Sequence, residues 1–291
     1  MHKNTHPDYI IVGAGSAGSA LAYRLTEDPG TSVLLLEAGK ATHPYSRMPV
    51  SFGLFIDKPG VNWRYRSEPE EGTANRAIPV PRGKMLGGSS AINGLVYVRG
   101  QTLDYDTWGQ LGNRSWSWEK VSKVFRRMEN FDGGDEEVRG RNGPLGISEV
   151  PDQNPLYDAL ISSAQSAGYP HNSDYNGLDQ EGIGKTQATI KAGRRMSTAR
   201  CYLEPAMRRQ NLEIITEAMT QHLILDGKRC VGVVYKKSGK KHAAKCTQEV
   251  ILSAGAVSSP QILELSGIGN PEILQRYGIE IQHELPAVGE N

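Results

Sequence analysis

Cysteine is scarce in this sequence, which limits the kinds of stabilisation and chemistry available to it. The 291 residues contain three cysteines, Cys201, Cys230 and Cys246. They form no CxxC pair and have no metal-ligand spacing, so neither a disulfide framework nor a zinc site is expected. An odd number of widely separated cysteines is typical of reduced thiols in a cytoplasmic compartment.

An excess of one charge and a long apolar run are also missing. The sequence has 33 Lys+Arg against 32 Asp+Glu, a net charge of +1, which gives no long-range attraction to nucleic acid. No apolar run approaches the roughly 18 residues of a membrane helix. Residues 1–8 are polar and lack the apolar core of a signal peptide. We therefore expect a cytoplasmic protein with no nucleic-acid partner and no transmembrane segment.

The first 40 residues contain the pattern of a strand, a helix and a second strand. Residues 9–12 are four consecutive apolar residues, as in a strand buried on both faces of a parallel sheet. Residues 16–28 have one apolar face and predict a helix, which Pro29-Gly30 ends. Residues 32–37 predict a second buried strand. This order indicates an α/β fold with a parallel central sheet.

A glycine motif lies between the first strand and the helix. Gly13, Gly15 and Gly18 form a GxGxxG run, and Glu37 closes the second strand. In this context the glycines allow a tight turn, close approach of a pyrophosphate and close helix–strand packing. Glu37 would accept hydrogen bonds from ribose hydroxyls and repel a 2′-phosphate, which disfavours NADP. The motif alone does not distinguish FAD from NAD.

A second glycine-rich segment, residues 82–94, favours FAD. A long cofactor needs a second contact region, and the small residues Gly87, Gly88 and Ser89 would let backbone amides reach its phosphate or ribityl oxygens. Asn93 could hydrogen-bond near the isoalloxazine ring. Taken alone, the run could equally be an ordinary Gly/Ser loop.

The remaining chain contains further strand and helix signals. Ser117 has the character of a helix N-cap, and a second helix is expected near residues 156–167. Alternating residues predict an antiparallel meander of strands 212–216, 220–225 and 230–236. A buried strand at 250–252 precedes a helix predicted to begin with Ser259 as N-cap and Pro260 at the first position.

Three separated segments resemble the glucose–methanol–choline (GMC) oxidoreductase family, particularly its choline- and alcohol-dehydrogenase members. They are residues 8–18 with 37–39, residues 83–106, and residues 255–269. The resemblance implies a Rossmann-like FAD-binding fold, with a parallel central sheet, helices and an antiparallel β-meander, plus an incomplete substrate-binding region. It places an FAD-binding domain at 1–142 and 204–291 and a partial substrate-binding region at 143–203.

The resemblance also implies a set of cofactor-binding residues. The first group, for the pyrophosphate and ribose, is Gly13, Gly15, Ser16, Ala17, Gly18, Glu37 and Ala38; the second, around the flavin, is Arg82, Met85, Gly87, Gly88, Ser89, Asn93, Gly94, Leu95 and Val96; the third is Met219, Ala254 and Gly255. Some members bind FAD covalently through a His just before the motif Asn. Ile92 occupies that position here, so non-covalent FAD is expected.

The resemblance implies FAD-dependent oxidation of a primary alcohol to an aldehyde, with oxygen, a quinone or another carrier as electron acceptor. The family's catalytic His pair belongs to its C-terminal half, and none of the seven His here lies in a similar segment. We therefore expect no catalytic residue in this chain. The alternatives are a catalytically inactive FAD-binding fragment, which we expect to be poorly soluble alone, and non-redox chemistry like that of a fatty-acid photodecarboxylase sharing this fold.

Overall fold

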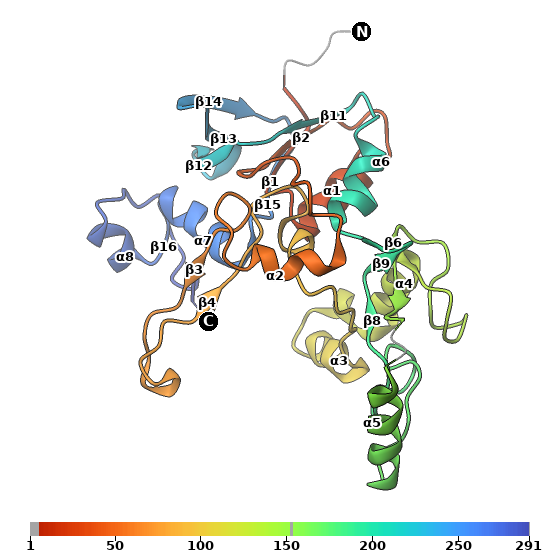
Figure 1. The fold of residues 1–291 in the computed structure, drawn as a ribbon. Helices are drawn as coiled ribbons and strands as arrows, with labels where there is room; N and C mark the ends of the chain where they lie inside the picture. Colours follow the sequence, from red (N-terminus) through yellow and green to blue (C-terminus); the bar gives the residue numbers. More distant parts are fainter. Residues whose placement is uncertain (1–5, 152–153, 291) are drawn as a thin grey trace. The chain divides into compact units, whose positions relative to one another are not determined.

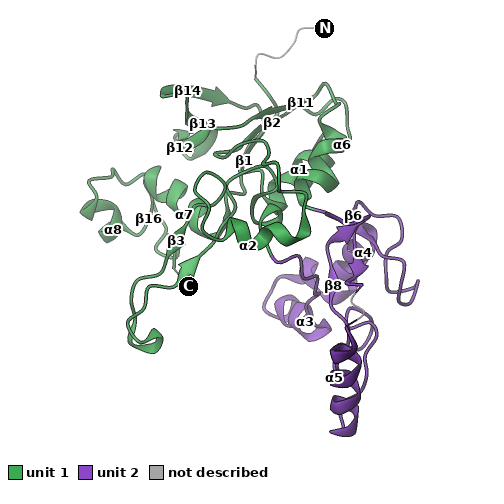
Figure 2. Cartoon of the chain, viewed as in Figure 1, with its two compact units in different colours: residues 1–93, 197–291 green, residues 94–196 purple. Residues whose placement is uncertain are grey.

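A computed structural model describes residues 6–151 and 154–290 of the chain. The chain divides into two compact units, residues 1–93 with 197–291 (unit 1) and residues 94–196 (unit 2) (Figure 2). The chain enters unit 2 at residue 94 and returns to unit 1 at residue 197, whereas the sequence analysis placed its domain boundaries at 143 and 204. The roles assigned to those segments stay predictions, and residues 1–5, 152–153 and 291 within them lie outside the described residues.

Unit 1 is built on a four-stranded parallel sheet (Figure 1). Its strand order is β11 (Leu212–Ile215), β2 (Val33–Leu36), β1 (Tyr9–Val12), β15 (Glu249–Leu252). All three neighbouring pairs are parallel and in register. The continuous apolar run of β1 is therefore explained by its central position in the sheet, as the sequence predicted.

Each face of this sheet packs against a different layer. Helix α1 (Ser16–Leu25) covers the face that contains Ile11 and Leu35, in one buried cluster. Ile10 and Val12 face the other way and join a second cluster. Helix α1 ends three residues before the predicted end at 28, because Thr26 turns back and donates its hydroxyl to Ala22 O (2.7 Å). The second strand is likewise shorter than predicted.

The second layer is a three-stranded antiparallel sheet, β12 (Met219–Asp226), β13 (Arg229–Lys237) and β14 (Lys240–Lys245). The prediction of a meander is correct for β12 and β13. It is wrong for 212–216, because β11 pairs in parallel with β2 and so belongs to the main sheet. The strand after the Ser238-Gly239 turn was not predicted, since β14 carries a polar, exposed sequence without an apolar alternation.

Helix α7 (Gly255–Leu265) begins five residues earlier than predicted. Pro260 lies inside the helix, and Ala254 rather than Ser259 is the N-cap. Ser259 still stabilises the helix start, because its hydroxyl oxygen accepts the Ala254 N–H (3.1 Å) from within the first turns. Ile262 of α7 packs into the cluster between the two sheets.

Shorter elements complete unit 1. In chain order they are η1 (Pro49–Ser51), α2 (Phe52–Phe55), β3 (Tyr65–Arg66), η2 (Glu71–Thr73), β4 (Pro79–Val80), η3 (Gly88–Ala91), the π-helical turn η5 (Ala199–Leu203), α6 (Glu204–Ala206), β16 (Ile268–Gly269), α8 (Pro271–Arg276) and β17 (His283–Glu284).

The described residues of unit 2 form three α-helices together with short strands. Ser117 is the N-cap of α4 (Trp118–Met128), as predicted, and Asn154 caps α5 (Pro155–Ser166) by accepting the Leu156 N–H. The other elements are α3 (Thr102–Gln110), η4 (Arg114–Trp116), β5 (Glu129–Asn130), β6 (Leu145–Gly146), β7 (Ser148–Glu149), β8 (Gln187–Ala188), β9 (Ile190–Lys191) and β10 (Arg194–Arg195).

A buried charge cluster lies at the centre of unit 2. The Glu129 carboxylate is fully buried and accepts hydrogen bonds from Arg99 (2.7 Å), Arg139 (3.0 Å) and the Tyr97 hydroxyl (2.5 Å). Arg139 also pairs with Asp174. Burial opposes ionisation of Glu129, but the Tyr97 hydrogen bond and the two guanidinium groups outweigh it and hold the pKa of Glu129 below its usual range.

Candidate functional site

The loop after β1 and the first turn of α1 each require a glycine. Gly13 has φ +96°, and a Cβ there would lie 2.6 Å from Ser253 O. A Cβ at Gly18 would lie 1.9 Å from Gly13 O, so the first turn of α1 could not pack against the end of β1 with any side chain at this position. These are the tight turn and the close packing that the motif predicted.

The second glycine segment docks directly on the first. The Gly87 N–H donates to Ala14 O (2.8 Å). A Cβ at Gly88, which has φ +51°, would lie 2.7 Å from Gly15 Cα. At Gly15 itself, the nearest described atom to a Cβ would be Gly88 Cα, at 4.0 Å. The backbone of Gly15 therefore stays open toward the surrounding space, as a site for close approach of a ligand requires.

Glu37 is buried at the end of β2 and holds the loop in place. Its side chain is 6% exposed; Oε2 accepts the Ala14 N–H (2.9 Å) and Oε1 accepts the Gly39 N–H (2.7 Å). Burial raises the pKa of Glu37, and the two backbone hydrogen bonds act against that shift. An ionised carboxylate has lone pairs for about four hydrogen bonds, so further donors can still bind it.

The third segment joins the loop at the end of β15. The Ser253 hydroxyl is within hydrogen-bonding distance of two carbonyl oxygens, Val12 O (3.0 Å) and Gly13 O (2.9 Å). Beside it, α7 begins at Gly255, which has φ +92°. The three segments that are far apart in the sequence thus meet at the carboxyl ends of β1, β2 and β15, where open α/β sheets bind their ligands.

An aromatic pair completes the site. Trp63 and Tyr65 stack with ring centroids 5.8 Å apart and planes 7° from parallel. Lys84 Nζ lies 4.3 Å from the Trp63 ring centroid, a cation–π arrangement. The Tyr65 and Ser258 hydroxyls are 3.0 Å apart and connect β3 to α7. The sequence analysis did not assign any of these residues to the site: Trp63 and Tyr65 lie outside the motifs, and Lys84 and Ser258 lie within motif segments but were given no role.

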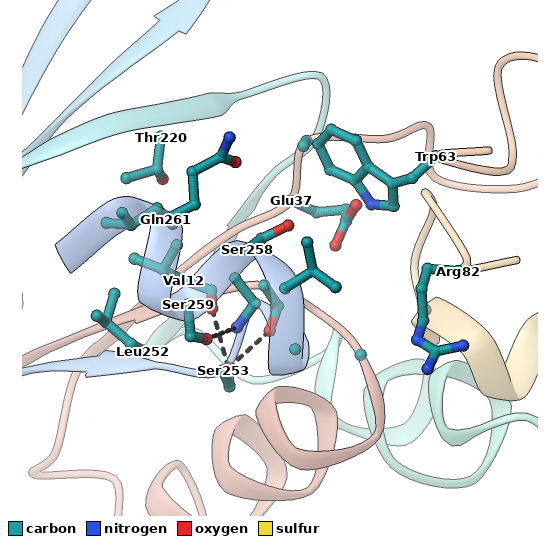
Figure 3. Close-up of a pocket in the computed structure, with 18 of the residues that line it drawn as sticks. Val12, Glu37, Trp63, Arg82, Thr220, Leu252, Ser253, Ser258, Ser259 and Gln261 are labelled. Atoms are coloured by element: carbon teal, nitrogen blue, oxygen red, sulfur yellow. Dashed lines mark hydrogen bonds between the residues drawn. The ribbon is translucent and has the colours of Figure 1, made fainter. Parts of the chain in front are cut away.

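These groups surround a cavity of about 660 Å³, within the size range of cofactor pockets (Figure 3). Twelve of the predicted cofactor-binding residues line it: Gly13, Gly15, Ser16, Ala17, Glu37, Ala38, Arg82, Gly88, Ser89, Met219, Ala254 and Gly255. Lining residues that the sequence analysis missed include Trp63, Tyr65, Thr220, Gln221, Ser253 and Ser258.

The other predicted site residues lie elsewhere. Gly18 packs closely against Gly13 O, and the Gly87 N–H donates to Ala14 O, but neither residue lines the cavity. Met85 is 1% exposed and packs in a cluster with Phe55 and Ile92. The Asn93 N–H donates to Ser89 O (2.9 Å). Gly94, Leu95 and Val96 belong to unit 2, and their part in cofactor binding stays a prediction.

Residues 6–151 and 154–290 contain neither a membrane-spanning helix nor a metal-binding cluster. None of their helices is both long and apolar enough to span a bilayer. They also contain no group of three or more His, Cys, Asp or Glu side chains arranged to hold a metal ion. The cytoplasmic location expected from the sequence stays a prediction.

Comparison with known proteins identifies the family. The chain is 47% identical over 98% of its length to the oxygen-dependent choline dehydrogenase of Escherichia coli strain K12, of which the match covers 52%. The crystal structure of pyridoxine 4-oxidase from Mesorbium loti superposes with a TM-score of 0.92 and 34% identity over 97% of this chain and 56% of that one. An FAD-dependent oxidoreductase from Chaetomium thermophilum gives a TM-score of 0.88 and 30% identity, over 97% and 51%.

The chain thus spans about half the length of the curated relatives it matches. The family model described as GMC oxidoreductase matches residues 7–291. The chain therefore belongs to the GMC oxidoreductase family.

Proposed function

We propose that this chain binds FAD non-covalently and is the cofactor-binding part of an enzyme that oxidises an alcohol CH–OH group. One observation carries the proposal. Three glycine-containing segments, separated by long stretches of sequence, meet around a single cavity of about 660 Å³ at the carboxyl edge of the parallel sheet. Family membership and the FAD-dependent relative support the same cofactor.

The residues present fit FAD. The open backbone at Gly15 and the N-terminus of α1 would receive the pyrophosphate, since unpaired N–H groups and the helix dipole favour an anion there. The Glu37 carboxylate would accept hydrogen bonds from the ribose hydroxyls. Gly88 and Ser89 would contact the flavin half, with Asn93 near the ring. Ile92 is 6% exposed and offers no nucleophile, which supports a non-covalent attachment.

The activity of the whole protein follows from this assignment. FAD supplies hydride acceptance when bound; the residues of this chain bind and orient it. We place the proton-accepting His in the part of the relatives that this chain does not cover. The substrate is a small primary alcohol, such as choline, and the acceptor is oxygen, a quinone or another carrier. A second candidate is FAD binding without turnover.

Flavin binding and reduction test the proposal directly. The chain, mixed with FAD, is expected to quench flavin fluorescence and to co-elute with FAD that acid precipitation of the protein releases. Anaerobic addition of choline or another primary alcohol then bleaches the flavin absorbance if the 291 residues are competent. Binding without bleaching is expected of both candidates for this chain alone, because the proton-accepting His is placed outside it. Bleaching by a longer protein that includes the part of the relatives not covered here supports the leading candidate, and no FAD binding refutes both.

The affinity for FAD is expected to fall as the pH falls toward the raised pKa of the Glu37 carboxyl. In the free protein, burial raises the pKa of Glu37. Ribose hydroxyls favour the ionised carboxylate and lower that pKa in the complex, so binding releases a proton between the two values and strengthens with rising pH. Glu37→Gln should weaken binding about tenfold or more at neutral pH and remove this pH dependence. Calorimetric titration at a series of pH values measures the affinity for FAD and its pH dependence. An unchanged pH profile in Glu37→Gln contradicts the assignment.

A further inference from the structure

One wall of the cavity contains an irregularity in strand β12. The pairing of β12 with β13 shifts register between Thr220 and His222, so Gln221 is an extra residue. Consecutive residues of a regular strand point to opposite faces. Here Thr220 and Gln221 both line the cavity. A β-bulge re-aims side chains in this way and is common beside functional sites.

The Thr220 hydroxyl is buried without a partner. The residue is 8% exposed, and Oγ1 has no hydrogen bond to any described group. Burying an unpaired hydroxyl is unfavourable, so such a group in a native protein calls for a ligand or a functional reason. The wall around it, which includes Ala218, Val257 and Ile262, is apolar and suited to a planar ring.

The position of Thr220 within the cavity limits which part of a ligand it can meet. In Figure 3, Thr220 and Gln261 lie on one side of Glu37, and Arg82 lies on the other. Arg82 begins the segment assigned to the flavin half. A ligand whose ribose hydroxyls bind Glu37 would therefore extend its other end, a purine, toward Thr220.

We propose that Thr220 is a positioning residue for the purine ring of the cofactor, to which its hydroxyl hydrogen-bonds. A hydroxyl can both donate and accept, so it can pair with either kind of group on the purine edge. This inference rests on the proposed function, since it takes FAD as the ligand. It adds a residue that no glycine motif marks and assigns a purpose to the bulge.

The variant Thr220→Val, of nearly the same shape, separates a ligand contact from a structural hydroxyl. The dissociation constants for FAD and for ADP should both rise about five- to tenfold, by the same factor, because ADP contains the purine half alone. Without nucleotide, the variant should melt about 2 °C higher, since it removes an unpaired buried hydroxyl. Thr220→Ser, which keeps the hydroxyl, should retain most of the affinity.

The other possible results refute either the assignment of Thr220 or the proposed function. Weaker FAD binding with unchanged ADP binding would place the hydroxyl at the flavin half and refute the assignment. Unchanged affinity for both, or a lower melting temperature for Thr220→Val without nucleotide, would also refute it. Failure of the unsubstituted chain to bind FAD would instead refute the proposed function, which separates the two failures.

Discussion

Gly18→Ala is expected to destabilise unit 1 by about 3 kcal/mol and to abolish measurable FAD binding. The added Cβ would lie 1.9 Å from Gly13 O and 2.6 Å from Ser253 Oγ, and the first of these is a backbone atom. Helix α1 must therefore move away from β1, which opens the buried cluster around Ile11. The melting temperature should fall by about 6–12 °C, measured by circular dichroism.

Gly15→Ala is the matched control. Gly15 has a φ of −73°, and among the described atoms its Cβ would approach only Gly88 Cα, at 4.0 Å. The fold should therefore keep its melting temperature within about 2 °C, while FAD binding weakens strongly because the methyl occupies the ligand's approach. Equal melting temperatures for the two variants would show that Gly18 is not a packing position.

Glu129→Gln is expected to destabilise unit 2 by about 3–5 kcal/mol. The carboxylate balances Arg99 (2.6 Å) and Arg139 (3.0 Å), and the three side chains are 0–2% exposed. An amide of the same shape would leave the buried Arg99 guanidinium without its counter-charge and Arg139 with Asp174 alone. Limited proteolysis of residues 94–196 should accelerate, while the cavity in unit 1 keeps its lining.

The Glu129 carboxylate also predicts how the stability of unit 2 changes in acid. Because the pKa of Glu129 is held below its usual value, its contribution is present above about pH 4.5 and is lost as the pH falls through the lowered pKa. Glu119→Gln provides the control, since Glu119 pairs with Lys120 and Lys123 on an exposed surface. It should leave the melting temperature unchanged at neutral pH. An equal loss in both variants would contradict the role of burial.

Part of this fold could be read directly from local sequence. The central strand was predicted because Tyr9–Val12 is apolar throughout, and burial of β1 on both faces requires that pattern. The element boundaries were less predictable. Pro260 was taken as a helix start, yet it lies inside α7, since a Ser side chain and the packing of Ile262 stabilise a longer helix.

The sheet that contains a strand could not be predicted from the strand itself. Residues 212–216 alternate like the meander that follows, and this pattern gives no information about a partner. Pairing with Val33–Leu36 in parallel assigns β11 to the main sheet. The polar strand β14 was missed for a related reason, since its backbone hydrogen bonds to β13 rather than its side chains define it.

The sequence by itself determined the positions where the backbone conformation or a close backbone contact permits only glycine. Gly13 and Gly18 are required by a positive φ and by a 1.9 Å approach, and Glu37 follows its strand directly. The tertiary structure alone decided that Trp63, Tyr65 and Thr220 share a cavity with them. Glycine leaves a readable mark because its constraint is local. A stacked ring or an unpaired hydroxyl acquires its meaning from residues far away in the chain, which only the order of the strands brings together.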